Sequence, residues 1–490
     1  MAFRSAAAVV RVGDTLSLAG TPSKTKAESR RTITLSEFKD KLQGSWIGQL
    51  VGVQWGVPTE MKFPGRIVPH EKVPVWKPEW INKAFDNDDL WPEVFYMSAM
   101  LDNGVNCSWE TLGEYYGKST WKLWSGQAIA RNHLRAGMKA PWTGHYSNNK
   151  ACDLLSWHIT SDFVGNICPG LPEAAMDIAW RCGHVTQFGD GVYGGTAPVM
   201  MHVTAFFVED VDEIIQAGRL AAPEGSKYRE AIEDVIALSK KYPDDWTKTW
   251  KKFHQKWWSH NSRGWGRKNW NIMTTYNGPF IFIGLLYGNG DFEQSMRIAM
   301  RCGMDSDNPI STVGGILGTW LGASKIPDKW KSALNRNQRF ASKDENKCMT
   351  YQEAVEASVK LAREVVLKVG GKITGERGDE VWHIPFQEFK PLILEQRPVK
   401  ENKAPALTAK HIATDGLNVA LEARAADNDS IKAYQWFFGD LSYSPASMKS
   451  ARITHTYRRP GSYLAICYVT DGIGNTSWKA VQVIVGEQSG

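Results

Sequence analysis

"KLQGSWIGQLVGVQWGVPTE", residues 41 to 60, places a glycine at every fourth position: Gly44, Gly48, Gly52 and Gly56. The apolar residues between them recur at three- and four-residue spacing, which predicts an α-helix. Since a helix has 3.6 residues per turn, positions four apart form a slowly drifting stripe along one face. Glycine in a helix interior costs up to ~1 kcal/mol relative to alanine. Four glycines on one face therefore indicate that another element packs very close.

A second ladder occurs in "STVGGILGTWLG" (311–322), with glycines at 314, 318 and 322. Immediately before it, "GMDSDNPI" (303–310) combines acids, an amide and a proline that starts a helix. The same combination occurs in "FDNDDLWPEVFY" (85–96). The chain thus has two acidic stretches, each followed by a predicted helix.

Each acidic stretch has two interpretations, helix capping or metal binding. In the first stretch, capping accounts for Pro92 and one aspartate. It leaves unexplained why Asp86, Asp88 and Asp89 crowd together, since like charges this close repel unless a cation or solvent screens them.

In the second stretch, Asn308 before Pro309 is enough to cap a helix. The alternative is that the two loops face each other and that their carboxylates, including Asp305 and Asp307, hold one or two divalent cations. Ligands of Asp and Asn type suit Mg²⁺, Mn²⁺ or Ca²⁺ rather than Zn²⁺ or copper.

The composition is that of a globular protein with two domains or one large domain and an appendage. The 490 residues are 42% hydrophobic and 22% charged, with a net charge of +6. The basic residues form no dense stripe, which argues against a nucleic-acid partner. The longest apolar stretches, 197–208 and 278–288, are shorter than the ~18 residues needed to cross a bilayer. We expect buried helices there and no transmembrane segment.

Neither the cysteines nor the N-terminus decides the cellular compartment. The seven cysteines stand singly without a C-x-x-C pair, which excludes the usual zinc spacings and a dense disulfide scaffold. We interpret most of them as lone buried thiols and leave an occasional disulfide open. In "MAFRSAAAVVRVGD" (1–14), Arg11 interrupts a short apolar patch before a full signal-peptide core of ~7 residues develops.

The pattern along the chain predicts a large all-α domain followed by a small β-sandwich. Helical periodicity extends from about residue 36 to 370, and we place the domain at 36–383 after an N-terminal extension, 1–35. Residues 384–406 carry four prolines among charges, which is typical of a linker. Residues 407–487 alternate apolar and polar side chains between turn signals, as expected for short antiparallel strands.

Four segments in order resemble the ADP-ribosylglycohydrolase family: residues 41–60, 85–90, 181–207 and 303–322. The resemblance covers about residues 36 to 370. It implies an all-α hydrolase with a binuclear Mg²⁺ centre between a Thr-Asp-Asp stretch and an Asp-x-Asp-Thr stretch. Carried over by position, the metal ligands are Asn87, Asp88, Asp89, Asp305, Asp307 and Asn308. Both threonines of the family pattern are asparagines here, whose oxygen still suits a hard cation.

The resemblance also implies roles for residues around the metals. Metal ions would grip the vicinal hydroxyls of a furanose and position a water, while Glu60 or Asp89 moves the proton. The choice between these two acids, and between inversion and retention, stays open. The family's Thr-His position matches His184, in a glycine-rich loop expected to open an apolar helix and to bind a phosphate or sugar at the helix N-terminus. The expected pocket residues are His184, Asp190, Tyr193, Gly194 and Gly195.

The tail and the aromatic content affect the expected substrate. "YQWFFGD" (434–440) and "ITHTYRRPGSYLAICYVTDGIGN" (453–475) resemble a PKD domain, with Leu441 where glycine is common. Such domains accompany extracellular bacterial hydrolases, which favours a secreted or periplasmic enzyme acting on a pentose-containing glycan rather than on an ADP-ribosyl-protein. We expect surface rings for sugar stacking among the 22 tryptophans, at Trp257, Trp258, Trp265 and Trp270. The alternative is a non-catalytic carbohydrate- or nucleotide-binding or structural protein, since some family members serve structurally as crystallins.

Overall fold

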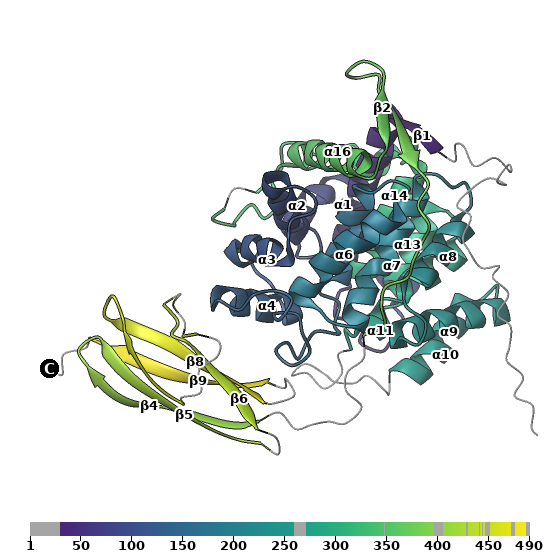
Figure 1. Ribbon diagram of the computed structural model, residues 1–490. Coiled ribbons are helices and arrows are strands. Elements are labelled where there is room, and N and C mark those ends of the chain that lie inside the picture. Colours follow the sequence, from purple (N-terminus) through teal and green to yellow (C-terminus); the bar gives the residue numbers. More distant parts are fainter. Residues whose placement is uncertain are drawn as a thin grey trace, which may run out of the picture.

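The computed structural model describes residues 30–258, 271–346, 348–395, 405–427, 430–440, 442, 444–445, 451–471 and 476–486. Figure 1 shows a helical domain and a separate β-sandwich near the C-terminus. The α-helices are α1 (Leu35–Gly56), α2 (Trp91–Asn103), α3 (Trp109–Lys118), α4 (Ser125–Arg135), α5 (Asp162–Asn166), α6 (Pro172–Thr186), α7 (Asp190–Ala205), α8 (Val211–Ala221), α9 (Lys227–Lys241), α10 (Trp246–Trp257), α11 (Thr274–Asn277), α12 (Phe280–Gly288), α13 (Phe292–Arg301), α14 (Asp307–Leu321), α15 (Asp328–Lys331) and α16 (Tyr351–Lys368). The short 3₁₀ helices are η1 (His70–Lys72), η2 (Pro78–Asp86), η3 (His158–Thr160) and η4 (Ala323–Lys325).

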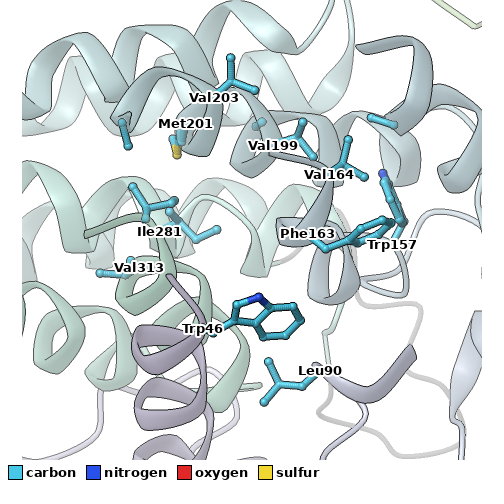
Figure 2. Close-up of a cluster of buried hydrophobic side chains, with 14 of the residues drawn as sticks. Trp46, Leu90, Trp157, Phe163, Val164, Val199, Met201, Val203, Ile281 and Val313 are labelled. Atoms are coloured by element: carbon cyan, nitrogen blue, oxygen red, sulfur yellow. The ribbon is translucent and has the colours of Figure 1, made fainter. Parts of the chain in front are cut away.

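One apolar core joins the helices of the large domain. Figure 2 shows Trp46 of α1 and Leu90, just before α2, in the same interior as Phe163 of α5 and Val199 of α7, all fully buried. The two long apolar stretches form the buried helices α7 and α12, as predicted. Among the described residues, no helix is both long and apolar enough to span a bilayer. The seven cysteines are buried free thiols, which confirms their expected role.

A small antiparallel sheet adds to the helical domain, in the strand order β1-β3-β2. Its strands are β1 (Arg30–Thr34), β2 (Lys372–Thr374) and β3 (Val381–Pro385). The described end of the expected N-terminal extension is therefore a strand of the domain. Part of the expected linker is also bound to the domain: the Gln387 side chain accepts hydrogen bonds from the first turn of α6, and Phe389 and Leu392 pack against a buried cluster on α6 to α8. Proline content alone did not reveal these contacts.

The C-terminal domain consists of two three-stranded antiparallel sheets. The first contains β4 (Ala406–Asp415), β5 (Asn418–Ala426) and β7 (Arg452–Thr456); the second contains β6 (Ile431–Phe437), β8 (Gly461–Asp471) and β9 (Thr476–Val485). Trp436 is fully buried between them. Asp440 accepts a 2.8 Å hydrogen bond from His455, whose ring stacks on Phe438. These residues of the expected PKD motif thus join the two sheets, while Leu441 lies outside the described residues.

The sandwich lies beside α4 of the helical domain (Figure 1). The hydroxyl of Tyr468 on β8 lies 2.5 Å from Nδ1 of His133 on α4, and both side chains are buried. Since Nε2 of His133 is 3.0 Å from the carbonyl of Asn148, it carries the ring proton, and Tyr468 is the donor to Nδ1.

Candidate metal centre

The two glycine ladders pack against each other along the antiparallel helices α1 and α14. A Cβ atom on Gly44 would lie 2.1 Å from the carbonyl oxygen of Gly318, and one on Gly48 would lie 1.9 Å from that of Gly314. At the end of the contact, a Cβ atom on Gly56 would lie 2.3 Å from the Cα of Asp307. No side chain fits at these positions. The prediction of a very close neighbour is confirmed, and the contact brings the end of α1 to the start of α14.

The turn after α1 is tied to the loop before α14. The hydroxyls of Thr59 and Ser306 form a 2.8 Å hydrogen bond, and the N–H of Met61 donates to the carbonyl of Met304 at 2.8 Å. Glu60 lies between these two connections. Its position next to the second acidic loop therefore follows from the helix contact and the turn together.

Three carboxylates meet at this junction. Oxygen atoms of Glu60, Asp305 and Asp307 all lie within 4.8 Å of one another. Asp307 is buried, while Glu60 and Asp305 are half-buried. Asn277, at the end of α11, holds the backbone of Asp305: its side chain donates to the Asp305 carbonyl at 3.2 Å and accepts from the Asp305 N–H at 3.3 Å.

The first acidic loop lies against the second. Nδ2 of Asn87 donates to Oδ2 of Asp307 at 3.2 Å, and Oδ1 of Asn87 accepts from the N–H of Asp89 at 2.8 Å. The Asp89 side chain is buried, and its Oδ2 has no hydrogen-bond partner among the described residues. Asp88 is half-buried. The metal-binding interpretation requires that the two acidic loops lie this close together.

Capping does not account for these acids. The N-cap residue of α2 is Leu90, and neither it nor Ser306, the N-cap residue of α14, makes a side-chain cap hydrogen bond. Pro92 does occupy the first turn of α2, as predicted. Asn308 lies inside α14, which corrects its expected capping role. Asp86 differs from its neighbours, because its carboxylate accepts hydrogen bonds from the N–H and hydroxyl of Ser342 at 2.7 and 2.8 Å.

Burial and mutual repulsion disfavour the charged forms of the clustered carboxyls. Burial, with the charge of Glu60, raises the pKa of Asp88 to about 7. Burial and then the charge of Asp307 raise the pKa of Asp89 well above its usual range. Burial and then Glu60 have the same effect on the pKa values of Asp305 and Asp307. The pKa of Glu60 is also raised by burial, against the opposing charge of Lys62.

The donor set suits a hard divalent cation. Among the described residues, Oδ2 of Asp89 and Oδ1 of Asp307 are buried without a hydrogen-bond partner. In the same part of the chain, no lysine or arginine forms an ion pair with Glu60 or with the aspartates at 88, 89, 305 and 307. A buried carboxylate group without a counter-charge is costly. Carboxylate oxygens are the ligands that Mg²⁺, Mn²⁺ and Ca²⁺ prefer, and oxygens on one cation lie within roughly twice the metal–oxygen distance of ~2.0–2.6 Å.

Sequence reasoning missed several residues that hold this site. Asn277 and Thr59 carry no motif of their own, although Thr59 directly precedes Glu60. His158 of η3 is fully buried, and its Nδ1 lies 3.0 Å from Oδ1 of Asn308. A lone histidine 150 positions from its partner gives no signal in a single sequence.

The expected substrate-binding residues have other partners in the structure. His184 lies at 2.9 Å from Glu395, Asp190 accepts from the N–H of Tyr228, and the Tyr193 hydroxyl donates to the Ile393 carbonyl. Gly194 and Gly195 lie within α7, where added Cβ atoms would lie 2.1 Å from Thr274 and 2.3 Å from Trp157. These glycines allow close packing inside a helix, which corrects the expectation of a glycine-rich loop. Among the described residues, none of these contacts reaches Glu60 or the aspartates of the two acidic loops.

The tryptophans expected at the surface are not the exposed ones in the structure. Trp257 is buried, and its Nε1 donates to Asp234 at 2.8 Å, so the expectation is wrong: α10 turns this ring inward. Trp258 is half-buried, and Trp265 and Trp270 lie outside the described residues. The exposed tryptophans of the described chain are Trp124, Trp142 and Trp478.

Comparisons with known proteins agree with the two-domain organisation. The ADP-ribosylglycohydrolase family model matches residues 34–365, and the PKD domain model matches residues 402–485. A comparison with curated proteins gave no match.

Among solved structures, an ADP-ribosylglycohydrolase-related protein complex is 14% identical over 68% of this chain and 100% of that chain, with a TM-score of 0.44. The PKD1 domain of Vibrio anguillarum Epp is 30% identical over 18% of this chain and 100% of that domain, with a TM-score of 0.16. The PKD1 domain of the Vibrio cholerae metalloprotease PrtV is 28% identical over 17% of this chain and 100% of that domain, with a TM-score of 0.16. On the extent of the family match, the chain belongs to the ADP-ribosylglycohydrolase family and carries a C-terminal PKD domain.

Proposed function

We propose that the helical domain is a divalent-cation-dependent glycosidase that cleaves an N- or O-glycosidic bond at a furanose. Membership of the family supports a hydrolase. The observation that carries the proposal is the junction of Glu60, Asp305 and Asp307, whose oxygens lie within 4.8 Å of one another beside the first acidic loop. This arrangement has the chemistry of a cation site, and its residues lie in the sequence segments that carry the resemblance to the family.

The residues of the centre divide into cation holders and proton carriers. The family pattern is a pair of Mg²⁺ ions, for which Mn²⁺ or Ca²⁺ are alternatives, and the resemblance gives the holders as Asn87, Asp88, Asp89, Asp305, Asp307 and Asn308. A bound cation supplies Lewis acidity and orients the furanose hydroxyls. Glu60 and Asp89 are the candidates for moving the proton between water and the leaving group, because burial raises the pKa of both carboxyls and so favours the protonated form that a general acid needs.

The PKD domain favours a particular substrate class within this proposal. Domains of this kind are common in extracellular proteins, so we extend the proposal to an extracellular or periplasmic enzyme acting on a pentose-containing glycan rather than on an ADP-ribosyl-protein. The exposed rings of Trp124 and Trp142 offer flat surfaces for sugar stacking.

A thermal shift experiment tests the cation centre. The melting temperature of the EDTA-treated full-length chain is measured with and without Mg²⁺ or Mn²⁺, for the wild type, Asp305→Ala and Asp86→Asn. We expect stabilisation of the wild type by either ion, no response in Asp305→Ala, and a preserved response in Asp86→Asn, whose carboxylate is directed to Ser342. If neither ion changes the melting temperature of the wild type, the proposed cation centre is wrong.

A substrate panel tests the reaction. The Mg²⁺-loaded chain is assayed on ADP-ribosyl-arginine, ADP-ribosyl-serine and aryl furanosides, with Glu60→Gln as the inactive comparison. We expect turnover of a furanoside that disappears in Glu60→Gln. Cation binding without turnover of any panel member favours the alternative, a non-catalytic binding protein.

A further inference from the structure

The two asparagines at the family's threonine positions have their oxygens engaged by the protein. Oδ1 of Asn87 accepts the Asp89 backbone N–H at 2.8 Å. Since a backbone N–H only donates, the oxygen must occupy this end of the amide. The other end, Nδ2, therefore faces Oδ2 of Asp307, at 3.2 Å. A carboxylate oxygen only accepts, so both hydrogen bonds require the same orientation.

Asn308 shows a parallel arrangement at the second position. Its Oδ1 lies 3.0 Å from Nδ1 of His158, and its Nδ2 is buried without a partner among the described residues. His158 is held deep in the domain, fully buried, on η3. The amide oxygen of Asn308 faces the ring Nδ1, and the amide nitrogen is the end left over.

These orientations matter because a cation needs oxygen ligands. A threonine offers one hydroxyl oxygen that accepts metal coordination, whereas an amide N–H₂ group offers only donors. Because Nδ2 of Asn87 faces the centre, it is not a cation ligand, and it donates a hydrogen bond to Oδ2 of Asp307. The remaining cluster of Glu60, Asp305 and Asp307 has its oxygens within 4.8 Å of one another, a span that one cation bridges.

We propose that this chain holds a single divalent cation, on Glu60, Asp305 and Asp307, and that Asn87 and Asn308 present amide groups where the family pattern has ligands of a second cation. This inference rests on the proposed function, since it concerns the same centre, and it departs from the binuclear arrangement that the resemblance implies. Asn87 is then a positioning residue that holds the Asp307 carboxylate. Glu60 is then a cation ligand, and of the two candidate proton carriers Asp89 is left for that role.

Counting the bound ions tests the inference without measuring activity. The EDTA-treated full-length chain is dialysed against Mn²⁺, and bound Mn²⁺ is counted by elemental analysis and examined by electron paramagnetic resonance. We expect one Mn²⁺ per chain and the spectrum of an isolated ion. Two Mn²⁺ per chain with an exchange-coupled spectrum overturn the single-cation inference and leave the proposed function intact. A chain that binds no Mn²⁺ overturns both.

Matched variants identify the cause. In the double variant Asn87→Thr/Asn308→Thr we expect a second Mn²⁺ and a coupled spectrum, because both positions then offer hydroxyl oxygens. Asn337→Thr, at an exposed asparagine outside both acidic loops, should keep one ion. The single variant Asn87→Thr serves if the double variant does not fold. If the threonine variants fold and still bind one ion, the amide orientation is not what limits the site.

Discussion

The two acidic loops are similar in composition, but the fold holds them in different ways. The loop before α14 is held along its backbone, since Gly56 contacts Asp307 and the Asn277 side chain brackets Asp305. The loop before α2 is held from outside, through Asp86 and Ser342, and from within, through Asn87. In the second loop both aspartates reach the centre, whereas in the first loop one of the three is an anchor. Acidic composition therefore does not tell a ligand from a structural carboxylate.

The largest effect is expected from breaking the helix contact that positions the second loop. Gly48→Val places a side chain where even a Cβ atom would lie 1.9 Å from the Gly314 carbonyl. Because the nearest atoms belong to the backbone of Gly314 and Gly315 and cannot move aside, we expect the unfolding free energy to fall by about 3 kcal/mol or more. Urea denaturation followed by circular dichroism measures it.

Gly117→Ala is the control, since a Cβ atom there would lie 3.2 Å from the Leu134 side chain. It should change stability by no more than about 1 kcal/mol. A Gly48→Val protein as stable as the wild type would show that α1 and α14 do not pack through this face.

Removing one carboxylate from each loop compares their shares in cation binding. Asp307 belongs to the group of three oxygens within 4.8 Å, while Asp88 lies beside it. We expect Asp307→Asn to weaken Mn²⁺ binding by about a hundredfold and Asp88→Asn by about tenfold. Calorimetric titration of the folded variants measures both. Equal losses would mean that the two loops contribute alike.

The pH dependence of the stability of the metal-free chain tests the first acidic loop by itself. Burial raises the pKa of Asp88 from 3.8 to about 7 in the folded chain. Between these values the folded state retains a proton that the unfolded state has lost, so this group lowers stability as pH rises through the window. In EDTA we expect Asp88→Asn to melt at a higher temperature than the wild type at pH 8, with the difference gone near pH 4.

Saturating Mg²⁺ should reverse the order at pH 8, because the wild type then gains from the ion that the variant binds less well. Thermal melts in both conditions measure this reversal. If the difference between variant and wild type in EDTA is the same at pH 4 and pH 8, the Asp88 carboxyl is not perturbed in the folded chain.

The glycine ladders and the acidic loops were predictable from the sequence, but the residues that hold the loops in place were not. The glycine spacing at positions 44 to 56 predicted a close neighbour, since only backbone contact explains four glycines on one helix face. The repeated order of acids, amide and proline indicated that the loops belong together. Asn277 and His158 escaped notice because their partners are distant in the chain. The inward turn of Trp257 depends on packing of α10, which its lysine-rich surroundings concealed.

The smallest effect is expected at Asp86, which we interpret as a structural residue of the first loop and not as a cation ligand. Asp86→Ala removes the acceptor of the Ser342 N–H and hydroxyl at 2.7 and 2.8 Å, and we expect it to cost about 1–2 kcal/mol of unfolding free energy. Ser342→Ala removes only the hydroxyl and should cost less, because the N–H still reaches the carboxylate. Both variants should bind Mn²⁺ like the wild type when measured well below their melting temperatures. Since Asp88 lies two residues further on, a loss of Mn²⁺ affinity in Asp86→Ala but not in Ser342→Ala would place the Asp86 charge in the centre after all.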